Sequence, residues 1–293
     1  MKRSVASLVS VFVLAVAGGL GARARAADAP AVLFPTAFSV EHELVQTDPG
    51  GDTFRTQPVV DTYGGSTLVS VRTGGSRVIV DFAKRTVTEV NVEKSTYWTL
   101  SFSQMGELSR RLVKADERPS AGAAASARAP SVAVQQDIRV EELSDGARER
   151  LAAPGIPAQR AGIRHFRSTV ANGVSADVWV DGTVRVSLPG LDALESFEKD
   201  ALGAVTASAV SPAQLVAAAR RAAAGAVPVR VKRPLTAAGG TVEDVATALT
   251  PLPAFPQKLL VIGDGFRRVP SPLEVMVAFA EDEASRDSSR LVK

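Results

Sequence analysis

Two histidines are the first residues to consider for catalytic or metal-binding chemistry. His42 stands between Glu41 and Glu43, and all three side chains could ligate a metal or move a proton. On a strand, successive side chains point to opposite faces, so the two glutamates cannot converge with His42 on one ion. His165 stands among arginines in "GIRHFRS", with no second histidine or acidic cluster at ligand spacing. We therefore expect His42 to be a solvated histidine on an edge strand, and His165 to have a structural or surface role.

The sequence contains no other motif that is typical of an enzyme active site. The chain has no cysteine, which excludes a cysteine nucleophile and a disulfide framework. It contains no G-x-S-x-G nucleophile elbow, and its paired glycines in "YGGS", "RTGGS" and "IGDGF" indicate turns rather than a phosphate loop. Carboxylates of a hydrolase can be brought together by the fold alone, so that class stays open as the least favoured alternative. No catalytic residue, cofactor or metal ligand is predicted, and we do not expect an enzyme.

The tryptophans, Trp98 and Trp179, are open to two interpretations. Both could be core anchors that pack strands against a helix. Alternatively, Trp98 could line an apolar cavity for an acyl chain or another hydrophobic ligand, together with neighbours on the same strand face. The candidate cavity residues are Val80, Phe82, Trp98, Leu100, Phe102 and Val178.

Alternating strands position these residues. In "SRVIVDF", Val78, Val80 and Phe82 point one way and Ile79 points the other. One face of the resulting sheet is apolar and the other is mixed, which is typical of a sheet covered on one side. Strands are predicted at 38–46, 66–72, 76–82, 86–92, 96–102, 227–233 and 258–269, and the segment 241–249 fits either a strand or a helix. A helix capped by Ser103 is predicted to run to about Lys114, and further helices are predicted at 191–205 and 211–224, the second of them capped by Ser211.

Between these elements, two turn signals stand out. Asn172-Gly173 predicts a hairpin between two alternating runs, and Asp181-Gly182 could reverse the chain a second time. Strands and helices are segregated along the chain rather than alternating as β-α-β units. This order predicts an α+β fold with an antiparallel sheet.

The N-terminus predicts export. Lys2 and Arg3 precede an apolar run that ends in "ARARAADAP", a pattern typical of a signal peptide cleaved after Ala26 or Ala27. A membrane anchor is the alternative. Removal of residues 1–27 takes away four of the 34 basic residues and none of the 31 acidic ones, which leaves 30 against 31. A nearly neutral mature chain argues against nucleic acid as a partner. We expect a periplasmic or otherwise secreted protein without a stable membrane anchor.

Composition also suggests internal boundaries. The stretch "RPSAGAAASARAPS" is low in complexity and indicates a linker or long surface loop. The predicted organisation is a signal peptide at 1–27, an N-terminal meander and helix at 28–117, a linker at 118–134, a C-terminal half at 135–280 and a charged, frayed tail at 281–293.

Three segments resemble an exported bacterial family of unknown function in the LolA-like class of lipoprotein-carrier folds. The first carries Asp81, Lys84, Arg85, Thr86, Lys94, Ser95, Tyr97 and Trp98; the second carries Gly162, Phe166, Asp177 and Trp179; the third carries Gly265, Phe266 and Arg268. The sequence departs from the family at His165, where the family often has Cys, and at Phe266, where it usually has Tyr.

The resemblance implies a curved antiparallel sheet, an incomplete barrel, with helices packed across its concave side. The resemblance further implies that 241–249 is the strand before the closing one. It also implies a non-enzymatic role in binding a lipid, an acyl chain or a lipoprotein in the cell envelope. The alternative is a structural or protein-interaction module with the same sheet, a packed core and no ligand.

Overall fold

The structure, a computed structural model, describes residues 32–116, 137–144, 163–171, 173–202, 212–236 and 239–290. The predicted signal peptide and the predicted linker at 118–134 lie outside the described residues, as do Asn172 of the hairpin and Ser211, the expected cap of a helix.

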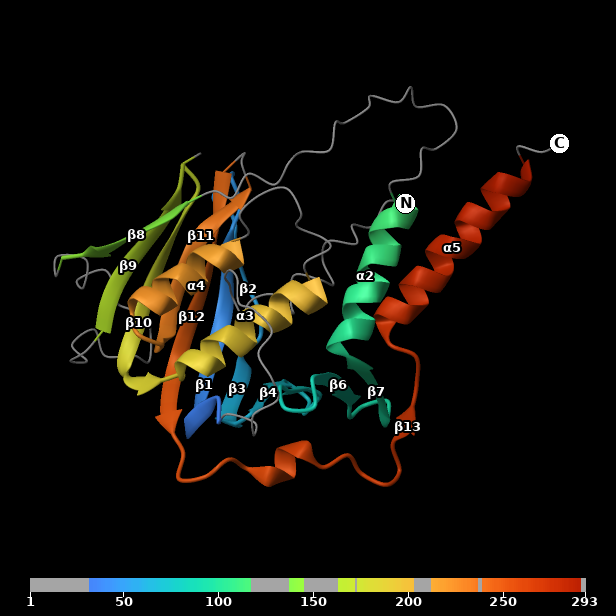
Figure 1. The fold of residues 1–293 in the computed structure, drawn as a ribbon, viewed down its shortest axis with the longest axis horizontal. Helices are drawn as coiled ribbons and strands as arrows, with labels where there is room; N and C mark the ends of the chain where they lie inside the picture. Colours follow the sequence, from blue (N-terminus) through green and yellow to red (C-terminus); the bar gives the residue numbers. More distant parts are fainter. Residues whose placement is uncertain are drawn as a thin grey trace.

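The fold is built on one sheet of 13 strands, drawn in Figure 1. Its order is β13-β7-β6-β5-β4-β3-β1-β12-β11-β10-β9-β8, and β2 pairs with β1 beside this path. Only β13 pairs in parallel, with β7; the other described pairs are antiparallel. The strands are β1 (Phe34–Thr47), β2 (Thr53–Arg55), β3 (Val59–Gly65), β4 (Thr67–Arg72), β5 (Arg77–Asp81), β6 (Thr86–Asn91), β7 (Thr96–Ser101), β8 (Ile138–Leu143), β9 (Ile163–Val170), β10 (Ser175–Arg185), β11 (Ala226–Thr236), β12 (Gly239–Pro251) and β13 (Arg267–Arg268).

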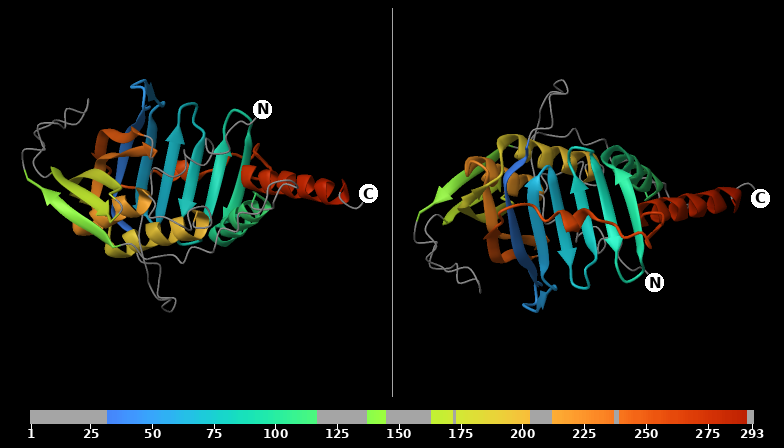
Figure 2. Two further views of the ribbon diagram at one scale, coloured as in Figure 1. Left: turned by 90° about the horizontal axis from the view of Figure 1, so that it is seen from above. Right: turned by 90° about the horizontal axis from the view of Figure 1, so that it is seen from below.

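Helices cover one face of this open sheet, which we term the inner face. The helices are α2 (Phe102–Asp116), α3 (Leu188–Leu202), α4 (Pro212–Ala222) and α5 (Pro272–Arg290). α3 and α4 cross the sheet, while α5 packs beside α2 and projects away from the sheet (Figures 1 and 2). This arrangement confirms the predicted α+β fold with an open antiparallel sheet and helices on one side. None of the described helices is both long and apolar enough to cross a membrane.

The start of α2 is set by a capping box. The Ser101 hydroxyl accepts a hydrogen bond from the backbone N–H of Gln104, and the Gln104 side chain accepts one from the backbone N–H of Ser101. The helix therefore begins at Phe102, directly after β7, and its cap lies two residues before the predicted Ser103.

The main core lies between the inner face and the helices α2 and α3. As predicted, Val78, Val80 and Phe82 face this core, and Ile79 faces a smaller cluster on the outer face. A third cluster packs α4 against β9, β10 and β11, with Val178 among its buried members. The alternation of side chains in β5 and β7 was therefore predicted correctly.

A strap of residues 252–266 crosses the outer face of β3 to β7, as Figure 2 shows from below. Its apolar side chains Phe255, Leu259 and Phe266 pack against the outer cluster of the sheet. The Arg77 guanidinium donates hydrogen bonds to the backbone carbonyls of Leu259, at 2.8 Å, and Val261. The predicted strand at 258–269 is thus wrong, because most of this segment lies across the strands and only β13 pairs.

Two further sequence interpretations are corrected. β10 continues through Asp181-Gly182 without a reversal; the Asp181 carboxylate accepts a hydrogen bond from the N–H of Thr183, and the pairing with β11 is interrupted there by a register shift. At the C-terminus, α5 continues to Arg290 and so includes most of the segment that was expected to fray. The predicted strand at 241–249 is confirmed as part of β12.

Candidate functional site

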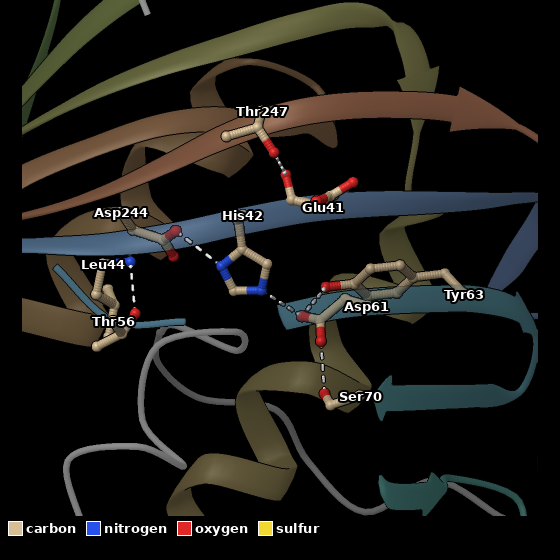
Figure 3. A network of polar contacts seen from close by, with 9 residues as sticks. All are labelled: Glu41, His42, Leu44, Thr56, Asp61, Tyr63, Ser70, Asp244 and Thr247. Atoms are coloured by element: carbon tan, nitrogen blue, oxygen red, sulfur yellow. Dashed lines mark hydrogen bonds and ion pairs between the residues drawn. The ribbon is translucent and has the colours of Figure 1, made fainter. Parts of the chain in front are cut away.

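His42 lies in the middle of the sheet, on β1 between β3 and β12. The expectation of a solvated edge strand is wrong, because only 11% of its side chain is exposed. Its Nδ1 lies 2.8 Å from Oδ1 of Asp244, within hydrogen-bond distance, and its Nε2 lies 3.4 Å from Oδ2 of Asp61 in an ion pair (Figure 3). Ser70 donates a hydrogen bond of 2.5 Å to the other oxygen of Asp61. Glu41 and Glu43 take no part in this network, as the strand alternation predicted.

The two carboxylates fix the charge of His42. Burial of the ring lowers its pKa, but the charge and the hydrogen bond of Asp244, followed by those of Asp61, raise the pKa overall from 6.5 to about 11. His42 is therefore a cation at neutral pH and cannot accept a proton as a general base. Burial and the neighbouring Asp61 also raise the pKa of Tyr63 well above its ordinary value. This group of residues is built as a buried ion network rather than as a proton-transfer site.

His165 is buried rather than at the surface. Its ring stacks on Trp179 with centroids 4.1 Å apart, and its Nε2 lies 3.1 Å from Oδ1 of Asp177. The Arg230 guanidinium lies 4.9 Å from the centre of the Trp179 ring, and Arg167 pairs with Asp177. Trp179 thus anchors three neighbouring strands through stacking and charge.

Five of the predicted cavity residues lie together. Val80, Phe82, Trp98, Leu100 and Phe102 are all buried in the main core. The sixth, Val178, is in the separate cluster beneath α4. The structure thus brings together the residues from the meander but not the one from the second half.

Phe197 of α3 contacts this apolar group. Its ring centroid lies 4.7 Å from that of Phe102 and 6.1 Å from that of Phe82. Leu191 and Leu194 of the same helix are buried in the same core. The sequence predicted a helix at 191–205, but nothing in it indicated which strand residues the helix would contact.

The apolar group ends at a polar pair. The indole Nε1–H of Trp98 donates a hydrogen bond of 3.0 Å to Oε2 of Glu89, which lies directly opposite in β6. Glu89 was missed in the sequence because one glutamate in an alternating strand is ordinarily a solvated side chain. Among the described residues, no group of three or more His, Asp or Glu side chains could hold a metal ion.

Comparisons with known proteins identify no family. No family model matches the chain, and no curated protein matches it. Among solved structures, PNGF-II is similar over 84% of this chain, with a TM-score of 0.36 and 9% identity, and this chain spans only 33% of its length. A structure described as a putative outer membrane lipoprotein-sorting protein domain from Vibrio parahaemolyticus is similar over 76% of this chain and 88% of its own length, with a TM-score of 0.26 and 7% identity. At these TM-scores neither likeness bears on function.

Proposed function

We propose that this protein binds an apolar ligand, such as a lipid or the acyl chain of a lipoprotein, between the inner face of β5 and β7 and helix α3. The observation that carries the proposal is the position of Phe197, whose ring is inserted among Phe82 and Phe102. A ligand chain would replace this ring, so that α3 serves as a movable cover over the site.

The rest of the proposal follows the sequence. The predicted signal peptide at 1–27 supports export of the mature chain to the periplasm or out of the cell. Binding draws its free energy from apolar burial, which contributes about 0.8 kcal/mol for each methylene group removed from water. No catalytic step is required, and His42 is not available as a base because it is held as a cation.

A packed scaffold without a ligand is the second candidate. It is favoured by the direct ring contacts of Phe82 with Phe34 and Phe102, at centroid distances of 6.0 and 6.2 Å. In this reading the aromatic residues are core anchors, and the exposed surface contacts protein partners.

Native mass spectrometry of the mature chain with uncharged straight-chain alcohols separates the two candidates. The ligand proposal predicts a stoichiometric complex with the wild type and a tighter complex with Phe197→Ala, because that change removes the ring that competes with the chain. Phe54→Ala is the matched control, since Phe54 is exposed on β2. A scaffold would leave the wild type free of ligand at every chain length, and that result would overturn the proposal.

A further inference from the structure

Glu89 is a partly buried carboxylate of the inner face without a cationic partner. Among the described residues, its carboxylate accepts one hydrogen bond, from the indole N–H of Trp98. Within the part of the chain that the structure describes, no Lys, Arg or His forms an ion pair with it. Asp177, by comparison, pairs with Arg167 on the same sheet.

The position of Glu89 is the margin of the apolar site. Two residues earlier on the same face of β6, Val87 is fully buried in the main core, and two residues later the face continues with the partly exposed Asn91. Across the strand pair, Trp98 belongs to the main core while its indole N–H reaches the carboxylate. The inner face therefore changes from apolar to polar at the Glu89–Trp98 pair.

We propose that Glu89 and Trp98 bind the headgroup of the ligand, and that this headgroup is an ammonium group on an apolar chain. The inference rests on the proposed function, because the chain of the same ligand would lie in the site next to Phe197. A carboxylate beside an aromatic ring attracts a cation through its charge and through the ring quadrupole. An anionic headgroup would instead be repelled by Glu89, which forms no ion pair with a Lys, Arg or His among the described residues.

The test compares three probes with the same twelve-carbon chain: dodecylammonium, dodecanoate and dodecyl maltoside, each below its micelle concentration. Binding to the full mature chain is measured by native mass spectrometry and by titration calorimetry. The wild type is expected to bind the ammonium probe most tightly. Glu89→Gln is expected to lower the affinity for that probe about tenfold. The glutamine keeps an acceptor for the Trp98 N–H, so the packing of the indole is preserved. Glu93→Gln, in the exposed turn after β6, is the control and should leave the affinity for each probe unchanged.

The outcomes are distinguishable. Equal binding of all three probes, unchanged by Glu89→Gln, would overturn the headgroup assignment and leave the apolar site standing. Tighter binding of dodecanoate by the wild type would overturn it as well. Failure of every probe to bind would overturn the proposed function itself.

Discussion

His42 joins three neighbouring strands through charge. It lies on β1, Asp61 lies on β3 and Asp244 lies on β12, so the network spans the place where the two halves of the sheet meet. Two buried carboxylates without the cation between them would be costly, because each would lose both its solvent and its counter-charge. The stability of the junction between the halves therefore depends on the protonated ring of His42.

Replacement of the ring is expected to destabilise the protein strongly. His42→Gln leaves two buried carboxylates uncompensated and should lower the free energy of unfolding by about 3 to 5 kcal/mol, measured by urea denaturation. The triple variant His42→Gln, Asp61→Asn, Asp244→Asn should recover much of this loss, because no charge is then left unpaired. A triple variant as unstable as the single one would show that the ring matters through its packing and not its charge.

The raised pKa of His42 also predicts how stability depends on pH. Between 6.5 and about 11 the folded chain keeps a proton that the unfolded chain has lost. The contribution of His42 is therefore complete below pH 6.5 and falls as pH rises, by about 1.4 kcal/mol per pH unit within that window. The measurement is the difference in unfolding free energy between wild type and His42→Gln at pH 7, 8 and 9. A difference that stays constant across these pH values would contradict the assigned charge.

At the scale of elements, local pattern predicted the consecutive strands of the meander well and the long-range strand pairs poorly. The alternation in β5 and β7 follows from side chains pointing to opposite faces, which needs no tertiary information. By contrast, His42 and Asp244 are separated by 202 residues, and β3, which carries Asp61, was not predicted at all. The strap was mistaken for a strand because its apolar residues match a strand composition, although they serve to cover the outer face.

The contact of the strap with β3 is close enough to test. A Cβ added to Gly64 would lie 2.7 Å from the Phe255 ring, so Gly64→Ala should displace the strap and cost about 1 to 3 kcal/mol of stability. Hydrogen exchange of residues 255–262 should accelerate in the same variant. Gly265→Ala is the matched control, because a Cβ there meets nothing within 4 Å. In combination with Phe255→Ala, the glycine substitution should cost far less than it does alone; full additivity would argue against the contact.

At the scale of the molecule, the strap and the β1–β12 pair connect the two halves of the chain. β12 belongs to the second half of the chain, yet its continuation runs across the meander and ends in β13 on the far edge beside β7.

The two tryptophans report on the halves separately, since Trp98 lies in the meander and Trp179 in the second half. Trp98→Phe and Trp179→Phe each leave one reporter. Within each variant, the fluorescence and circular dichroism midpoints in urea are expected to coincide, because the halves cannot unfold independently. Comparison within a variant removes the effect of the substitution on overall stability. A fluorescence midpoint at a lower or higher urea concentration than the circular dichroism midpoint would show that the halves unfold as two separate units. The strap would then cover the outer face without joining the halves.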